Sequence, residues 1–370
     1  MSRRQKRYLR RMEKRAYNRQ KALGENLKFE NVCSISSLYK AAFKSAKGVM
    51  FKESVQRYLL NLFSNLYRTR QELLQGKDVR LGFIEFDIVE RGKARHIRSV
   101  HFRERVVQKS LCTNCLSPVL TYNLITDNGA SQKGKGVHFA LKRVVKFLKE
   151  HFNRYGNNGY ALLIDFKSYF DNIEHAPIKS YIRKFIEEPQ ILKLSDDFID
   201  AFGDKGLGLG SETSQINAVA YINEIDHYIK EKSGAKIYVR YMDDSIIIHH
   251  SKEFLEKLLA DLKKKYAEYG ITVNDKKSYI TDLKHGFTFL KTRFFLTDTG
   301  KILRKACRDR ITSERKKLKR LGKLFNEGTI TQEAIRRNFD SWSGSMLHRN
   351  ARKTVYTMTK LFNELLKRKE

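Results

Sequence analysis

Three aspartates stand where strands are predicted to end. Asp243 and Asp244 interrupt YVRYMDDSIII (238–248), a segment otherwise rich in the Tyr, Val and Ile that favour β-strands. Adjacent side chains on a strand point to opposite faces of the sheet, so the two carboxylates cannot both face solvent if one face is buried. Asp165 ends the apolar run GYALLIDF (159–166). A carboxylate at the end of a buried strand is costly unless it binds something.

If these strands pair in one sheet, the three carboxylates converge, and such a cluster in a basic protein predicts bound Mg²⁺. The alternative is that each aspartate caps a turn or pairs with a nearby Lys or Arg. The residue types alone leave both interpretations open.

The surrounding patterns predict the elements that position these acids. YVRYM and SIIIHH are expected strands around the Asp pair, and a helix should run from Ser251 to Gly270 with an apolar face. Residues 82–102 predict two strands joined by the turn ERGK, with a helix from about Arg103. Further expectations are one helix over 54–76, short strands at ITVN (271–274) and FTFLKTRFF (287–295), and a basic, helical region from Lys301 to the end.

Charge is the strongest global property of the chain. Lys plus Arg number 74 against 41 acidic residues, a net charge of +33. Such a balance predicts attraction to a polyanion, and nucleic acid is the commonest one. A basic membrane-surface protein is the main rival, but no lipidation signal, signal peptide or membrane-length apolar run supports it. We therefore expect a cytoplasmic protein with no membrane partner.

Cysteine gives a weaker signal. Cys112 and Cys115 form a single CxxC, and no second Cys or His pair at similar spacing accompanies it. Buried thiols on a helix are expected there rather than a zinc site.

The ordered motifs resemble the palm of reverse transcriptases over residues 80–295. LLIDFKSYF (162–170), a Gly-rich loop and YMDD (241–244) follow one another as they do in that family. The resemblance implies an α+β right-hand polymerase, with fingers, a palm containing an antiparallel sheet, and a helical thumb. The expected parts are a basic arm (1–25), fingers (26–155), palm (156–296) and thumb (297–370).

The resemblance also implies site residues. Asp165, Asp243, Asp244 and the main-chain carbonyl of Phe166 would bind two Mg²⁺ ions, which Mn²⁺ can replace. Phe170 stands where the family keeps an aromatic gate against the 2′-hydroxyl, which favours deoxynucleotides.

Other residues are expected to contact the nucleotide. Lys93 and Arg95 would bind its triphosphate, and Lys277 in NDKKSYI would donate a proton to the departing pyrophosphate. The remaining substrate-binding candidates are Tyr241, Gly210 and Gln215.

The loop LGSETSQ (209–215) departs from the QGxxxSP of most reverse transcriptases. Together with KGKGVHFAL (133–141) it resembles the enzymes of diversity-generating retroelements, in which the variant is associated with relaxed fidelity opposite template adenines. YFDNIEH (169–175), in place of the more usual YFPSIDH, departs from that group.

Three alternatives remain. They are a stand-alone bacterial reverse transcriptase of antiphage defence, a catalytically inactive palm protein that only binds nucleic acid, and an RNA-dependent RNA polymerase. For the reverse transcriptase, the expected partners are an RNA template, a DNA or RNA primer, deoxynucleotides, a dedicated non-coding RNA and a small basic accessory protein.

Overall fold

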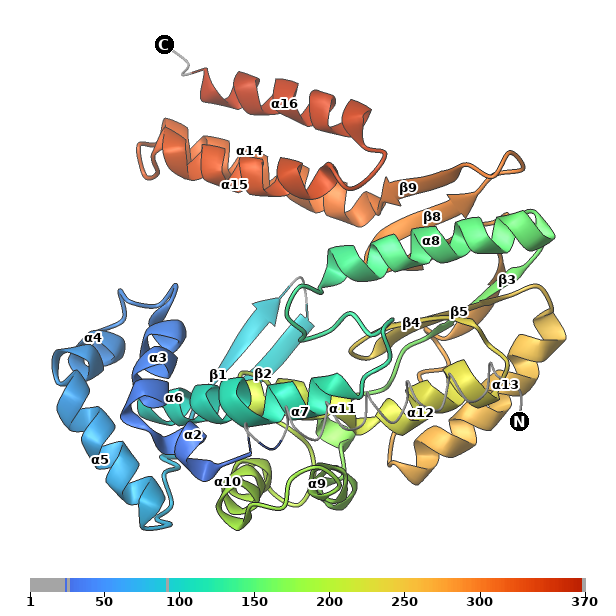
Figure 1. Cartoon of the computed structure of the whole chain (residues 1–370). Coiled ribbons are helices and arrows are strands. Elements are labelled where there is room, and N and C mark those ends of the chain that lie inside the picture. The colour runs from blue at the N-terminus through green and yellow to red at the C-terminus, as the bar shows by residue number, and fades with distance from the viewer. Residues whose placement is uncertain (1–23, 25–26, 91–92, 368–370) are drawn as a thin grey trace.

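The computed structural model describes residues 24, 27–90 and 93–367 (Figure 1). The predicted basic arm over residues 1–25 lies outside the described residues, apart from Gly24. The described chain combines helices with antiparallel sheets, which confirms the predicted α+β class.

A four-stranded antiparallel sheet lies at the centre of the chain, with strand order β4-β5-β3-β6. The predicted strands around the three aspartates are confirmed as β3, β4 and β5. Their neighbour β6 begins after the predicted strand ITVN, which forms only one isolated bridge, Phe166 with Val273. The bounds are β3 Tyr160–Ile164, β4 Ile237–Tyr241, β5 Asp244–His249 and β6 Tyr279–Asp282.

Both faces of this sheet are buried, which explains why its strands are apolar runs instead of alternating ones. One face packs on α8 (Val137–Tyr155), and the other packs on α13 (Lys252–Glu268) (Figure 1). The predicted helix from Ser251 is confirmed as α13. Ser251 caps it by accepting a hydrogen bond from the Phe254 amide, and its predicted apolar residues Leu255, Leu258, Leu262 and Tyr266 are all buried.

The N-terminal half contains a helical group beside a two-stranded antiparallel ribbon. The ribbon confirms the predicted hairpin, and the next helix begins at Phe102, close to the predicted start. The single helix predicted over 54–76 is wrong, because the chain leaves helical geometry at Asn61, where the Asn65 side chain donates to the Tyr58 carbonyl oxygen. The bounds are α2 Phe29–Cys33, α3 Ile35–Ala46, α4 Glu53–Leu60, α5 Leu62–Leu74, β1 Phe83–Glu90, β2 Lys93–Val100 and α6 Phe102–Leu111.

The CxxC lies in a π-helical turn, η1 (Cys112–Leu116), followed by α7 (Ser117–Tyr122). Both thiols are free and fully buried, and burial raises the pKa of Cys115 to about 12. The expectation of buried helical thiols is confirmed.

Between β3 and β4 in the sequence the chain forms short helices, which lie below the sheet in Figure 1. Among them, α11 carries most of the predicted loop LGSETSQ. The bounds are η2 Phe170–Asn172, α9 His175–Arg183, α10 Pro189–Asp200, α11 Glu212–Tyr221, α12 Asn223–His227 and η3 Tyr228–Lys232.

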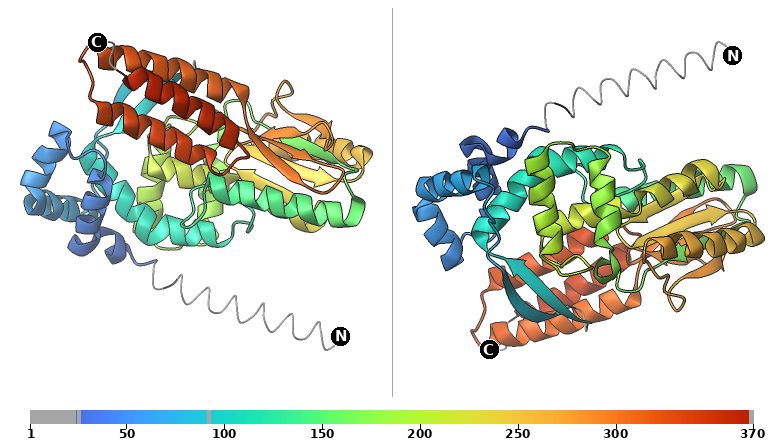
Figure 2. Two further views of the ribbon diagram at one scale, coloured as in Figure 1. Left: turned by 90° about the horizontal axis from the view of Figure 1, so that it is seen from above. Right: turned by 90° about the horizontal axis from the view of Figure 1, so that it is seen from below.

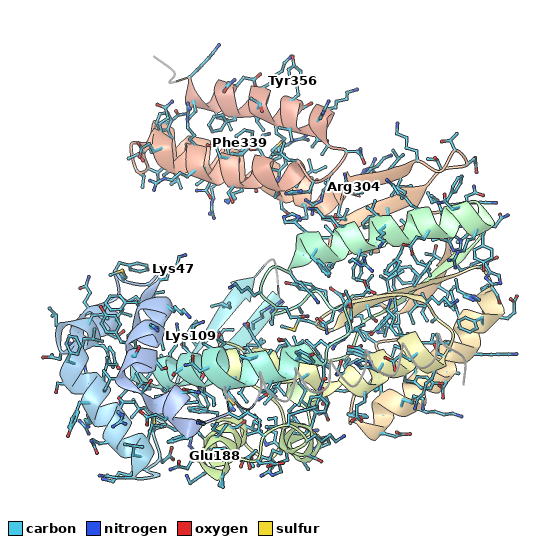
Figure 3. The ribbon with its side chains drawn as sticks, viewed as in Figure 1. Lys47, Lys109, Glu188, Arg304, Phe339 and Tyr356 are labelled. Carbon is cyan, nitrogen blue, oxygen red and sulfur yellow. The ribbon has the colours of Figure 1, made fainter. Side chains whose placement is uncertain are left out.

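A second antiparallel sheet, β7-β8-β9, leads into the C-terminal helices. The expectation that the chain is helical from Lys301 is wrong at its start, because Ile302–Ala306 forms β9 and pairs with β8. Three helices then lie side by side (Figure 2), with Phe339 packed among them (Figure 3). The bounds are β7 Phe287–Phe289, β8 Thr292–Leu296, β9 Ile302–Ala306, α14 Arg308–Asn326, α15 Gln332–Met346 and α16 Arg352–Leu366.

No helix within the described ranges has the length and apolar content needed to cross a bilayer.

Candidate functional site

The YMDD segment is the turn of the β4–β5 hairpin. Tyr241 pairs with Asp244, which leaves Met242 and Asp243 as a two-residue loop. Met242 has a positive φ of 55°, a conformation that side chains other than glycine adopt at a cost of about 1–3 kcal/mol. The hairpin therefore presents Asp243 from a strained turn and Asp244 from the first position of β5.

The sheet register brings the predicted acids together. Ile164 of β3 pairs with Ser245 of β5, so one further step places Asp165 beside Asp244. Burial raises the pKa of Asp243, and the charge of Asp165 raises it further. Burial and then the charges of Asp243 and Asp165 raise the pKa of Asp244 to about 7. The three carboxylates are close enough to repel one another.

Asp165 is held by the turn that follows α13. Asn274 donates through its side-chain amide to Asp165 Oδ1 (3.1 Å) and through its main-chain N–H to the Asp165 carbonyl oxygen (2.8 Å). The Asp165 N–H donates to Ser278 Oγ (3.0 Å). Lys277 Nζ lies 3.2 Å from Asp165 Oδ1. The structure thus places the predicted proton donor Lys277 directly beside a predicted metal ligand.

The hairpin turn is also held from beneath by a buried ion pair. Arg240 and Asp226 are both fully buried, and Arg240 Nε donates to both carboxylate oxygens of Asp226 (2.9 and 2.8 Å). Arg240 also donates to the carbonyl oxygens of Val219 (2.7 Å) and Met242 (3.1 Å). The Tyr238 hydroxyl donates to Asp226 (2.6 Å). One guanidinium therefore links α12, α11 and the strained turn.

The ion pair explains how a charged side chain is tolerated inside this sheet. Burial opposes the charged form of Arg240, but the neighbouring Asp226 outweighs it, so the pKa of Arg240 is raised. The main chain of Arg240 is fixed as well, because its N–H donates to the Asp127 carbonyl oxygen and its own carbonyl accepts from Gly129 N–H.

The predicted triphosphate residues lie on β2. The charge of Arg95 acts on Asp243, after that of Lys277, and partly offsets the rise in the Asp243 pKa. Lys93 is the first residue of β2 and pairs with Glu90 in the ribbon; its side chain lies outside the described part of the chain. Arg95 therefore lies near enough to the acid cluster for its charge to act on Asp243, and its contact with a triphosphate stays a prediction.

The LGSETSQ loop lies against strand β2 of the two-stranded ribbon. Gly210 has a φ of 112°, and a Cβ there would lie 3.3 Å from the Arg98 carbonyl oxygen. Glycine at this position therefore permits a close approach to strand β2. The expected contact of Gly210 with the nucleotide stays a prediction. Ser211 caps α11 and donates to Gln108, which donates in turn to the buried Glu104.

Gly210 and Gln215 line one pocket of about 390 Å³ between α3, α6 and α11. Three cations, Lys44, Arg105 and Lys109, line the same pocket, and Lys109 pairs with Glu212 (2.7 Å). Figure 3 labels Lys109 on α6. The two loop residues predicted to bind substrate thus share a basic cavity.

The predicted aromatic residues differ in exposure. Phe166 is buried, and its ring packs on Tyr169 and Tyr266. Phe170 is half-buried in η2, with its ring edge against Tyr169 and its carbonyl oxygen accepting from the Leu207 N–H. Tyr241 is half-buried and packs against Gly129. The Phe170 ring is therefore partly accessible and partly packed against the core.

Sequence reasoning missed Arg240, Asp226 and Asn274. An arginine in the middle of the apolar strand YVRYM was the available signal, since a buried cation needs a partner. Nothing in the sequence identified Asp226 as that partner, because the pairing depends on how α12 packs under the sheet.

The donor set of the acid cluster fits a hard divalent cation. Mg²⁺ is bound by carboxylate oxygens. The pKa values of Asp243 and Asp244 are raised by burial and then by the neighbouring carboxylates, and a bound cation would favour their charged forms. Within the described residues, however, no group of three or more His, Cys, Asp or Glu side chains is gathered tightly enough to enclose a metal ion. The chemistry of the site fits, although its side chains do not form a closed cage.

Comparison with solved structures finds telomerases at low similarity. The apo telomerase of Candida tropicalis truncated from its C-terminal domain is 16% identical, with coverage of 60% of this chain and 55% of that chain and a TM-score of 0.47. Telomerase of Candida albicans in complex with a TWJ fragment of telomeric RNA is 14% identical, with coverage of 72% of this chain and 55% of that chain and a TM-score of 0.49. Apo telomerase of Candida tropicalis is 14% identical, with coverage of 83% of this chain and 64% of that chain and a TM-score of 0.48. The chain thus covers less than two thirds of the length of each.

Among curated proteins, none matches this chain. The family described as "Reverse transcriptase (RNA-dependent DNA polymerase)" matches residues 87–294, which span β1 to β8 and include all three aspartates. The predicted right-hand polymerase fold is confirmed by this match together with the antiparallel sheets. Because the match covers more than half of its residues, the chain belongs to the reverse transcriptase family.

Proposed function

We propose that this protein is an RNA-directed DNA polymerase that extends a DNA or RNA primer on an RNA template. The observation that carries the proposal is the convergence of Asp165, Asp243 and Asp244 from two paired strands, in a chain of the reverse transcriptase family. The net charge of +33 supports a nucleic-acid substrate.

The three carboxylates, with the main-chain carbonyl of Phe166, would hold two divalent cations. Mg²⁺ bound there, or Mn²⁺ in its place, would lower the pKa of the primer 3′-hydroxyl and neutralise charge on the reacting phosphates. Asn274 and Ser278 keep Asp165 in place for this task, and Arg240 keeps the turn that carries Asp243 in place.

The protein's own cations would act on the nucleotide. Arg95, whose charge reaches Asp243, and Lys93 on the same strand would bind the triphosphate. Lys277 beside Asp165 would give a proton to the pyrophosphate as it leaves. The half-buried Phe170 ring would exclude the 2′-hydroxyl, and Tyr241, Gly210 and Gln215 would contact the nascent pair. Basic residues of α14 to α16 would track the template–primer backbone as a thumb.

Primer extension tests this proposal. The purified protein should extend a DNA primer on an RNA template with deoxynucleotides and Mg²⁺, and chelation should stop the reaction. Equal use of ribonucleotides would point to an RNA polymerase instead. A failure to extend any primer under conditions in which the protein binds the duplex would leave only the inactive nucleic-acid-binding alternative.

A narrower proposal rests on the loop LGSETSQ. We infer that the enzyme is an error-prone reverse transcriptase of a diversity-generating retroelement, and that it works with a dedicated non-coding RNA and a small basic accessory protein. The supporting observation is that Gln215 lies exposed in the same basic pocket as Gly210. Sequencing of cDNA made by the pure enzyme tests it: errors concentrated opposite template adenines are expected, and uniformly faithful copies would favour the antiphage-defence alternative.

A further inference from the structure

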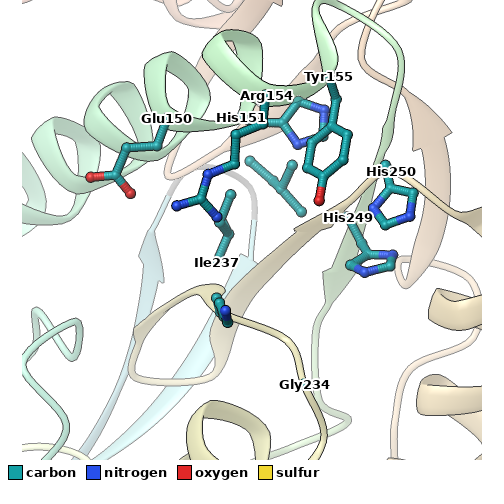
Figure 4. Close-up of a pocket in the computed structure, with 10 residues that line it drawn as sticks. Glu150, His151, Arg154, Tyr155, Gly234, Ile237, His249 and His250 are labelled. Atoms are coloured by element: carbon teal, nitrogen blue, oxygen red, sulfur yellow. The ribbon is translucent and has the colours of Figure 1, made fainter.

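A second polar pocket lies at the other end of the central sheet from the aspartates. It has a volume of about 320 Å³, in the range of small-ligand sites. Its walls are the C-terminal half of α8, the start of β4 and the end of β5 (Figure 4). Because β5 runs from Asp244 to His249, five steps of roughly 3.3 Å separate the pocket from the acid cluster by about 17 Å. The pocket is therefore distinct from the candidate active site.

Two cations in this pocket lack a counter-ion. Arg154 of α8 and Lys236 before β4 are exposed and make no ion pair with any residue of the described chain. Figure 4 shows the Arg154 side chain reaching from α8 toward the start of β4. The one acid that lines the pocket, Glu150, is paired with Lys146, and its carboxylate points away from the imidazoles in Figure 4. The pocket therefore has an unneutralised positive charge suited to a phosphate.

A row of aromatic rings lies beside these cations. The rings of Tyr155 and His250 are stacked, with centroids 4.5 Å apart and planes inclined by 20°. Both residues are exposed. The row of rings continues on both sides, with His151 beside Tyr155 (5.3 Å) and His249 beside His250 (4.2 Å), so the exposed edges of Tyr155 and His250 border the pocket. Exposed aromatics next to cations are how proteins bind single nucleotides of a strand without reading its sequence.

Two further imidazoles add hydrogen-bonding groups and are fixed in place. His151 Nε2 is bonded to the Asn158 carbonyl oxygen (2.8 Å), and His249 Nδ1 accepts from the Ser251 N–H (3.1 Å). Burial lowers the pKa of both imidazoles and so favours their neutral forms, and each has a second ring nitrogen outside these hydrogen bonds. Gly159 permits this arrangement, because a Cβ there would lie 2.4 Å from His151 Nε2.

We propose that this pocket is a second nucleotide-binding site, in which a base packs against the exposed edges of the Tyr155 and His250 rings and its phosphate lies between Arg154 and Lys236. The site goes beyond the proposed polymerisation and does not depend on it. The same chemistry is offered by a free nucleoside monophosphate and by one nucleotide of a bound RNA strand, and the test separates these two sources.

The test uses the full-length protein and two probes, 5′-AMP and a short oligoribonucleotide that contains one photoreactive 4-thiouridine. Binding of AMP is measured by calorimetry, and the oligoribonucleotide cross-link is mapped to peptides by mass spectrometry. A site-specific readout is needed because a chain of net charge +33 binds RNA at many places.

The variant Arg154→Ala/Lys236→Ala should reduce binding or cross-linking in the pocket about tenfold or more, the loss expected for charge-assisted phosphate contacts. The matched control, Lys149→Ala/Lys232→Ala, removes the same charge from α8 and from the segment before β4, at exposed residues that do not line the pocket. It should leave both signals unchanged. Tyr155→Ala should lose the site, and Tyr155→Phe should keep it.

Pocket-dependent binding of AMP would identify a free nucleotide as the ligand, and a pocket cross-link from the oligoribonucleotide without AMP binding would identify an RNA strand. Cross-links that map elsewhere, or an equal loss in pocket and control variants, would overturn the proposal. Primer extension measured in parallel keeps the two proposals separate: the pocket variants should extend a simple primer–template normally, and Asp243→Asn should keep the pocket signal while it loses extension.

Discussion

The buried pair of Arg240 and Asp226 makes a prediction in which stability and activity separate. Replacing Arg240 with Met removes every hydrogen bond from the guanidinium, and among the described residues it leaves the buried Asp226 carboxylate with only the Tyr238 hydroxyl as a partner. Removing one member of such a pair costs about 3–5 kcal/mol of folding free energy. Because domains are stable by roughly 5–15 kcal/mol, the variant should fold with a much lower melting temperature.

The double variant Asp226→Leu/Arg240→Met removes both charges and should recover most of that loss, since an apolar pair often replaces a buried ion pair without cost. Its activity should stay low. The Met242 carbonyl oxygen still lacks the donor that fixed the strained YMDD turn. A lost hydrogen bond from a charged group is worth about 1.5–3 kcal/mol, which corresponds to about 10- to 100-fold in kcat.

Thermal unfolding and single-nucleotide primer extension, measured on both variants and on Arg240→Lys, check this reasoning. The lysine variant keeps the charge but not the forked donors, so it should keep more stability than Arg240→Met while still extending slowly. Two results would refute the account: a single variant that loses less than about 1 kcal/mol, or a double variant that recovers stability and kcat together.

Three further predictions concern single residues. Asp244→Asn should stabilise the metal-free protein on the order of 1–2 kcal/mol at pH about 8 and have little effect near pH 4. The folded pKa of about 7 lies above the unfolded value of about 3.9, so the folding stability of the wild type falls as pH rises between them. Thermal unfolding in chelator at both pH values checks this, and a variant no more stable than wild type at pH about 8 would contradict it. Gly210→Ala should cost more than about 1 kcal/mol because of its positive φ and its close approach to the Arg98 carbonyl oxygen. Gly344→Ala, in the last turn of α15 with open space around it, should be neutral or stabilising in the same melting experiment. Equal melting temperatures for the two variants would count against the strain at Gly210. Phe170→Ala should raise ribonucleotide use relative to deoxynucleotide use in competitive extension, and an unchanged ratio would mean that the ring is not the sugar gate.

The sequence predicted the parts of this protein that depend on local pattern. The strands around Asp165, Asp243 and Asp244 and the helix that begins at Ser251 follow from apolar spacing and capping, and all were found. The helix over 54–76 failed because apolar spacing continues across Asn61 even though the backbone does not. Strand β9 was missed because Ile302–Ala306 is basic and short, and its pairing with β8 is decided by tertiary contacts.

The site was predictable to the same degree. Residue types and order pointed to the three acids and to Lys277, which the structure places close to one another, and their roles in catalysis stay predictions. The interactions that hold the site in place could not be predicted from the sequence. The Arg240–Asp226 ion pair and the hydrogen bond from Asn274 to Asp165 join residues whose contact depends on tertiary packing. Gly210 illustrates the limit. A glycine makes a positive φ possible, but only the structure shows that strand β2 is its neighbour.

Primer extension by Asp165→Asn and Asp243→Asn is the most direct test of the central claim, that acids from two separate strands form one site. Each variant should retain the fold, measured by melting temperature, and lose extension on an RNA template in Mg²⁺, while Asp204→Asn, an exposed acid outside the site, should extend as wild type does. Normal extension by a folded Asp165→Asn or Asp243→Asn variant would contradict the claim.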